Sequence, residues 1–144
     1  MAITLLSPVS DIYRRDVSVD DNALVNPSDS TCLVSGLWVN IDANGNAADD
    51  TGPTVVNMYQ VFTEKGDYSA QALGKITILN TFDYIAETDQ YASSVDGAGQ
   101  FLTVDADGKL AKTTSAGDTV VALSLAAPTT AGLLKYQRVS PFRY

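Results

Sequence analysis

Short apolar runs that end at glycine, asparagine, aspartate or serine recur along the 144 residues of this chain. No window of about eleven residues keeps apolar side chains at the helical spacing without meeting glycine, proline or a β-branched cluster. Because short apolar runs bounded by turn residues are typical of strands, the pattern predicts an all-β protein with little or no helix. The expected strands cover residues 31–41, 54–64, 74–86, 100–105, 109–114, 118–127 and 132–140.

The segment 104–110, VDADGKL, carries the strongest local signal. Asp107 and Gly108 separate two apolar runs, and glycine readily adopts the positive φ that a tight hairpin turn needs. This segment therefore predicts a β-hairpin. A longer polar loop is expected at residues 41–53.

The expected final strand has no purely apolar face, because both of its alternating sets of side chains mix apolar and polar residues. One set is Leu134, Tyr136 and Arg138. The other set is Leu133, Lys135, Gln137 and Val139. A central antiparallel strand buries at least one face, so the mixed pattern favours a sheet edge or an interface.

Residues 1–30 differ from the rest of the chain, with two prolines, scattered apolar residues and no sustained period. A frayed terminus is one interpretation. A disordered tail, however, rarely carries so many large apolar side chains, which favours an ordered, extended arm resting on an apolar surface. These side chains are Ile3, Leu5, Leu6, Ile12, Tyr13 and Leu24. The expected organisation is an extended N-terminal arm at 1–30 and a small β-barrel or β-sandwich domain at 31–144.

Composition narrows the possible partners. Nine basic and 17 acidic residues give a net charge of −8, which disfavours binding to a nucleic-acid phosphate backbone. No run of about 18 apolar residues could span a membrane, and residues 1–6 lack the basic start of a secretory signal. The lone Cys32 can form neither an internal disulfide nor a zinc site of the usual kind. We therefore expect an acidic domain made where thiols stay reduced, with no nucleic-acid or membrane partner.

Candidate catalytic chemistry is weak. The chain has no histidine, so a histidine general base or a Ser-His-Asp triad is excluded. Asp42, Asn44 and Asn46 resemble the start of a calcium loop, but Ala47 stands where the sharp turn needs glycine, so a polar turn is the better interpretation. No pair of acids, activated nucleophile or phosphate-binding loop stands out. The sequence predicts no enzyme and no catalytic, cofactor-binding or metal-binding residue.

Charge is distributed unevenly along the chain. From Asp16 to Thr63 there are seven aspartates and no lysine or arginine, whereas the last ten residues combine aromatic and basic side chains. Such asymmetry suits docking on a partner or on a copy of the protein, although a solvated acidic face that only maintains solubility is an alternative. Tyrosine and arginine commonly anchor interfaces. The expected C-terminal interface residues are Lys135, Tyr136, Arg138, Phe142, Arg143 and Tyr144.

The layout of residues 96–140 runs DGAGQ, FLTV, the DADGK hairpin, LAKTT, SAGD, TVVALSLAA and GLLKYQRVS. This order of strands and turns resembles the small β-barrel part of tailed-bacteriophage capsid decoration (cement) proteins. The resemblance covers about a third of the chain, and it rests on turn residues and not on residues of a reaction.

The resemblance implies a virion protein, made in the host cytoplasm, that binds the outer capsid surface and clamps adjacent major capsid subunits. It also implies a homo-oligomer, with a trimer commoner than a dimer. The arm would contact the capsid or a neighbouring subunit. The arm residues assigned to that contact are Ile3, Leu5, Leu6, Ile12, Tyr13, Arg14 and Arg15.

Two other classes stay open. A carbohydrate-binding or adhesion module would use Trp38 and the seven tyrosines as stacking platforms, in an exposed row. A lone tryptophan between Leu37 and Val39 is more often a core residue, however. A small β-barrel enzyme would need a pocket lined by clustered acids with perturbed pKa values.

Overall fold

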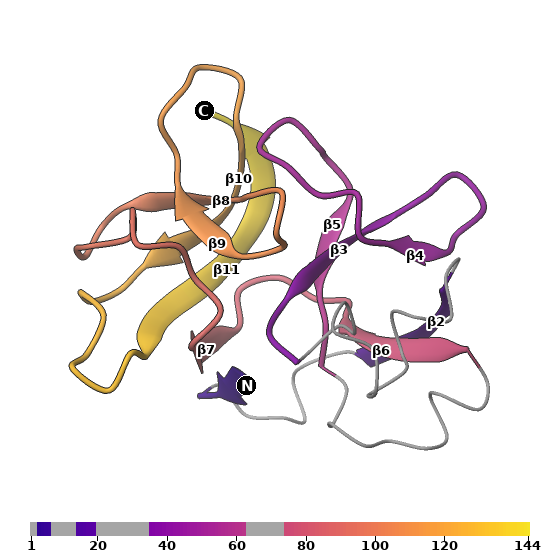
Figure 1. The fold of residues 1–144 in the computed structure, drawn as a ribbon, viewed down its shortest axis with the longest axis horizontal. Helices are drawn as coiled ribbons and strands as arrows, with labels where there is room; N and C mark the ends of the chain where they lie inside the picture. Colours follow the sequence, from indigo (N-terminus) through magenta and orange to yellow (C-terminus); the bar gives the residue numbers. More distant parts are fainter. Residues whose placement is uncertain (1–2, 7–13, 20–34, 63–73) are drawn as a thin grey trace.

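The computed structural model describes residues 3–6, 14–19, 35–62 and 74–144 (Figure 1). These residues form an all-β fold, and none of them is helical, as the sequence predicts. The strands are β1 (Ile3–Leu5), β2 (Arg14–Ser18), β3 (Trp38–Ile41), β4 (Ala47–Ala48), β5 (Met58–Gln60), β6 (Lys75–Leu79), β7 (Ile85–Thr88), β8 (Phe101–Val104), β9 (Leu110–Lys112), β10 (Thr119–Ser124) and β11 (Leu134–Arg143). Among the described residues, no helix is long and apolar enough to cross a membrane.

The strands form one large and two small sheets. The large sheet has six antiparallel strands in the order β1-β7-β11-β10-β8-β9, while β2 pairs with β6, and β3 lies between β4 and β5. Isolated bridges, Val61 to Ile78 and Val19 to Ala47, link the two small sheets. The sheets are not closed into a barrel by continuous ladders, so the sandwich, and not the barrel, is the consistent form of the fold.

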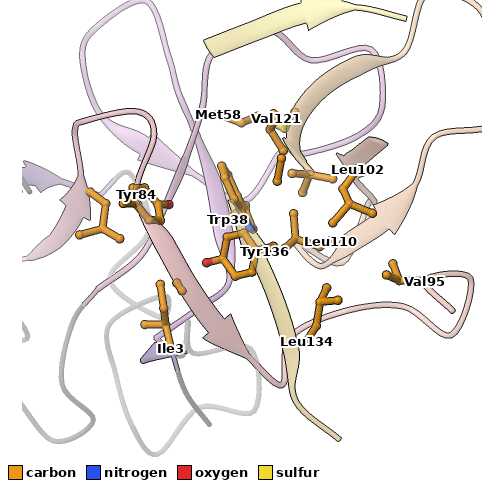
Figure 2. Close-up of a cluster of buried hydrophobic side chains, with 14 residues drawn as sticks. Ile3, Trp38, Met58, Tyr84, Val95, Leu102, Leu110, Val121, Leu134 and Tyr136 are labelled. Carbon is orange, nitrogen blue, oxygen red and sulfur yellow. The ribbon is translucent and has the colours of Figure 1, made fainter. Parts of the chain in front are cut away.

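Two apolar clusters hold the sheets together, and strand β3 belongs to both. Trp38 lies in the larger cluster with residues of the six-stranded sheet, and Figure 2 shows these side chains gathered around it. Its neighbour Val39 lies in the smaller cluster, which comprises Val17, Val39, Ala47, Val61, Ile76 and Ile78. Because consecutive strand residues point to opposite faces, β3 buries one face in each cluster and joins the two parts of the fold.

The predicted hairpin at 104–110 is confirmed. Strands β8 and β9 pair antiparallel around a turn in which Asp105 Oδ1 accepts hydrogen bonds from the backbone N–H groups of Asp107 and Lys109, at 2.9 and 3.0 Å. Gly108 has φ +76°, and a Cβ atom there would lie 2.9 Å from the carbonyl oxygen of Trp38. Glycine is therefore required both by the turn and by the close approach of β3.

The predicted edge or interface position of the final strand is wrong. Strand β11 lies between β7 and β10, inside the large sheet. Leu134, Tyr136 and Arg138 all point to its buried face. The alternation pattern misleads because arginine is normally a polar, exposed residue, whereas this fold provides partners for the Arg138 guanidinium in the core.

The single strand expected at 74–86 is also wrong, because the chain breaks there into β6 and β7, which belong to different sheets. Asp83 in the intervening turn has φ +66°, a conformation unusual for a residue other than glycine. The expected polar loop at 41–53 contains the short strand β4, paired with β3.

Two segments of the expected N-terminal arm are strands of the domain itself. Strand β1 pairs with β7, and Ile3 is only 8% exposed in the larger cluster. Strand β2 pairs with β6, and Val17 is buried in the smaller cluster. Burial against a sheet of the same chain stabilises an apolar side chain as well as burial against a partner does. Residues 3–5 and 14–18 therefore belong to the domain. This corrects the domain boundary expected at residue 30. Residues 7–13 and 20–34, including Ile12, Tyr13 and Leu24, lie outside the described residues.

Candidate docking surface

The C-terminal end of β11 is held along its backbone by the start of β10. Thr119 and Val120 pair with Arg143 and Phe142 in the antiparallel ladder. Beyond the strand, the N–H of Tyr144 donates to the carbonyl of Asp118 at 2.8 Å, and the N–H of Gly117 donates to the carbonyl of Tyr144 at 3.0 Å. The backbone up to residue 144 is therefore fixed by hydrogen bonds in the described structure.

Three aromatic side chains meet on the outer face at this end of the large sheet. Phe101, Phe142 and Tyr144 are 43%, 44% and 53% exposed. The ring of Phe101 lies 5.6 Å from that of Phe142 and 6.2 Å from that of Tyr144, centroid to centroid, in edge-to-face arrangements. Val120, which pairs with Phe142, is fully buried but belongs to neither core cluster. We call Phe101, Phe142, Arg143 and Tyr144 the aromatic surface.

Arg143 adds a positive charge to the aromatic surface. One of its guanidinium nitrogens, Nη1, donates to the carbonyl of Gly117 at 2.7 Å. No described carboxylate forms a salt bridge with it. The surface therefore presents three partly exposed rings and a cation without an acidic partner among the described residues.

The opposite end of β11 begins at the loop from β10, residues 125–133, which we call the hairpin tip. Its sequence, LAAPTTAGL, contains no charged residue. Thr129 holds the loop, because its N–H donates to the carbonyl of Leu133 at 2.9 Å and its carbonyl accepts from the N–H of Gly132 at 2.9 Å. Leu133 is 36% exposed, and Ala126, Ala127 and Ala131 are exposed as well. The tip is thus an ordered, uncharged surface with small apolar side chains.

Arg138 and Tyr136, both expected at the partner interface, are instead buried in the core, at 2% and 0% exposure. The guanidinium of Arg138 lies 4.7 Å from the ring centroid of Trp38 and 5.0 Å from that of Phe82. Its Nη1 and Nη2 donate to the carbonyls of Val121 and Met58, at 3.2 and 3.0 Å. Burial lowers the pKa of Arg138, but an arginine stays charged at neutral pH. Neither Arg138 nor Tyr136 is accessible to a partner, which corrects the prediction for both.

A hydrogen-bonded group surrounds Gln60 beside this arginine. The hydroxyls of Tyr84 and Tyr136 both donate to Gln60 Oε1, the former at 2.7 Å. Gln60 Nε2 donates to the carbonyl of Gly36 at 2.9 Å. Removal from water raises the pKa of both tyrosines well above the usual value. The group links the β3–β5 sheet to the large sheet, and its polar atoms are used within the protein.

The remaining expected contact residues are scattered over the described structure. Leu5 is half-buried, and Leu6 is 44% exposed beyond β1. Arg15 is exposed, with its guanidinium 5.9 Å from the ring centroid of Tyr59. Arg14 pairs through its backbone with Leu79 in β6, on a different sheet from the aromatic surface. Lys135 is exposed, and its backbone lies opposite Glu87 of β7 in the antiparallel ladder.

Of the expected contacts, the structure brings together Phe142, Arg143 and Tyr144. It adds Phe101, which the sequence analysis missed. One signal could have found it, because Phe101 is out of phase with Leu102 and Val104 on the same strand. An aromatic residue out of phase with the apolar face of a strand points away from the core.

The calcium-like segment forms a polar turn, as expected. Asp42 Oδ1 accepts hydrogen bonds from the backbone N–H groups of Asn44 and Asn46, at 2.8 and 2.9 Å. No group of three or more potential metal ligands among His, Cys, Asp and Glu occurs in the described part of the chain. Trp38 is 1% exposed, which confirms it as a core residue and not a sugar-stacking platform.

The geometry defines an all-β domain with an aromatic surface and an uncharged hairpin tip at the two ends of its longest strand. No protein-family model, curated protein or solved structure matches the chain.

Proposed function

We propose that this protein is a structural virion component that binds the outer surface of an icosahedral capsid and clamps adjacent subunits. The observation that carries the proposal is the presence of two exposed apolar surfaces at opposite ends of β11. The hairpin tip would contact the major capsid protein, and the aromatic surface would reach the neighbouring subunit on the shell. The turn layout that resembles capsid decoration proteins gives the class of partner.

The spacing of the two surfaces suits a clamp. Strand β11 has ten residues. At about 3.3 Å per residue, it separates its ends by roughly 30 Å. Figure 1 shows the loop before β11 and the C-terminus at opposite ends of this strand. A rigid link between two weak contacts produces strong attachment to a repetitive lattice, because the second contact forms at a high effective concentration.

The distribution of charge also supports docking through the hairpin tip and the aromatic surface. The chain has a net charge of −8, but the hairpin tip has no charged residue and the aromatic surface carries only Arg143. Docking through these surfaces would avoid the cost of removing carboxylates from water at the interface.

Co-sedimentation with capsids assembled from the major capsid protein of the same virus tests the proposal. The native protein should sediment with the capsids, and Ala131→Glu should weaken its binding about tenfold, because it places a charge in the proposed contact. The matched control is Ala106→Glu, the same change at an exposed position of the β8–β9 turn, which should bind like the native protein. A native protein that stays in the supernatant would contradict the proposal.

A carbohydrate-binding module is the second candidate, because three aromatic side chains are exposed together. Two features weigh against it. The planes of Phe142 and Tyr144 are inclined to Phe101 by 89° and 63°, so the rings offer no common flat platform, and Trp38, Tyr84 and Tyr136 are buried. Saturable changes in the resonances of Phe101 and Tyr144 on titration with oligosaccharides would favour the module over the clamp.

A further inference from the structure

Two hairpins of this protein have the same turn. Residues 42–46, DANGN, join β3 to β4, and residues 105–109, DADGK, join β8 to β9. In each turn the first aspartate accepts two backbone hydrogen bonds through Oδ1, and the glycine N–H donates to the carbonyl of that aspartate, at 3.0 Å in the first turn and 3.2 Å in the second. The sheets also share an order, because β3 lies between β4 and β5 as β8 lies between β9 and β10. The two turns can therefore be compared directly.

The glycines of the two turns have similar backbones but different surroundings. Gly45 has φ +80° and Gly108 has φ +76°. A Cβ atom at Gly108 would lie 2.9 Å from the carbonyl oxygen of Trp38, whose N–H donates to the carbonyl of Gly108 at 2.9 Å. A Cβ atom at Gly45 would meet no described atom within 4 Å. The turn at 105–109 is thus packed against β3, whereas the turn at 42–46 has open space around its glycine.

Asn44, the residue before Gly45, has a side chain that the protein does not hold. It is exposed, and no described group forms a hydrogen bond with its side-chain amide. It also belongs to the single Asn-Gly pair of the sequence. Asn57 is exposed too, but its Nδ2 donates to the carbonyl of Ile41 at 3.0 Å, and Met58 follows it. Asn44 therefore combines a free amide with a following residue that has no side chain to hinder an approach.

We propose that Asn44 is a site of spontaneous deamidation in the folded protein. The backbone nitrogen of Gly45 gives its proton to a base in solution and attacks Cγ of Asn44, and the new C–N bond closes a succinimide ring as ammonia leaves. Water then opens the ring at either carbonyl and leaves aspartate or isoaspartate, so a water oxygen replaces the amide nitrogen and no oxidant is needed. Glycine favours the step because no Cβ atom blocks the ring closure. This modification goes beyond capsid binding, because it needs no partner.

The hydrogen bonds of the turn should slow this reaction without preventing it. The N–H of Gly45 donates to the carbonyl of Asp42, so the nitrogen must leave that carbonyl before it attacks. An exposed turn can open without disrupting either core cluster, and local openings of this kind require little free energy. The isoaspartate product has one more main-chain carbon and a carboxylate beside Asp42. We therefore expect it to weaken the pairing of β3 with β4.

Timed incubation of the purified full-length protein at mildly alkaline pH, followed by peptide mapping with mass spectrometry, tests the proposal. The amide of Asn44 should be replaced by an acid, and isoaspartyl methyltransferase should label part of the product. Folding should slow the reaction about tenfold relative to the same protein in urea, the factor expected if opening the turn costs about 1.4 kcal/mol. If Asn44 stays intact in the folded protein over a time that converts it completely in urea, the turn protects it and the proposal is wrong.

The matched control is Asp107→Asn, which places a second Asn-Gly pair in the equivalent turn at an exposed position. In urea both pairs should react at similar rates. In the folded variant, position 107 should react at least about tenfold more slowly than Asn44, because Gly108 is fixed against Trp38. Equal rates at the two positions in the folded variant would overturn the proposal that the open turn selects Asn44. Circular dichroism establishes that the variant is folded, and if it is not, the comparison of the native protein with and without urea decides the matter.

Discussion

Arg138 and Arg143 lie five residues apart on the same strand, yet their surroundings are opposite. Arg138 is 2% exposed, lies against Trp38 and Phe82, and donates to two backbone carbonyls. Arg143 is exposed beside three aromatic rings and donates to one carbonyl. One arginine stabilises the junction of the sheets, and the other is available to a partner. The same residue type in one strand thus serves the fold at one position and the surface at another.

The largest expected effect comes from replacing each of the two arginines by alanine in separate variants and comparing their stabilities. Arg138→Ala should lower the free energy of unfolding by about 3 kcal/mol, because it leaves a cavity beside Trp38 and two buried carbonyls without donors. Arg143→Ala should change it by less than about 0.5 kcal/mol, as is usual at an exposed position. Urea denaturation followed by circular dichroism measures both. Equal losses of unfolding free energy in the two variants would show that the buried Arg138 contributes no more to stability than the exposed Arg143.

A smaller loss is expected when the polar group next to Arg138 is broken. Gln60→Leu removes the acceptor of the Tyr84 and Tyr136 hydroxyls and the donor to Gly36. Leaving such buried groups unpaired should cost about 2 kcal/mol, measured in the same urea experiment. If Gln60→Leu is as stable as the native protein, the group contributes only packing.

Alkaline pH should destabilise the same junction. Burial raises the pKa of Tyr84 and Tyr136 in the folded state, whereas in the unfolded chain both ionise near the usual value of 10. Below pH 10 both tyrosines are protonated in the folded and the unfolded state, so their ionisation does not change the free energy of unfolding there. Above it the unfolded state loses protons first, and the free energy of unfolding should fall by up to about 1.4 kcal/mol per pH unit for each tyrosine.

Unfolding measured across this pH range, in the native protein and in Tyr84→Phe, tests the expectation. The variant should show a shallower decline, because one of the two groups is removed. An identical slope in both proteins would assign the alkaline loss to other residues.

Local turn chemistry was predictable from the sequence because it depends on neighbouring residues. Asp107 and Gly108 mark the β8–β9 turn, and Asp42 with Asn44 and Asn46 marks the β3–β4 turn. Strand pairing over long distances was not predictable in the same way. The partners of β1 and β2 are β7 and β6, which lie more than about fifty residues further along the chain, and nothing in residues 1–30 specifies them.

The candidate docking surface was predictable in part. Phe142, Arg143 and Tyr144 follow from the aromatic and basic composition of the last ten residues. The same reasoning wrongly included Tyr136 and Arg138, because composition does not distinguish the two faces of a strand or reveal which neighbours satisfy a charge. Phe101 belongs to the aromatic surface only because β8 and β11 both pair with β10, which brings Phe101 beside Phe142.

The sequence alone determined the class of secondary structure, the turns and the acidic character, since these depend on residue type, short-range spacing and charge. The three-dimensional arrangement decided which side chains are buried. Burial depends on sheet order, and sheet order brings together residues that are distant in the chain. For this reason the fate of two arginines in one strand could be read only from the folded protein.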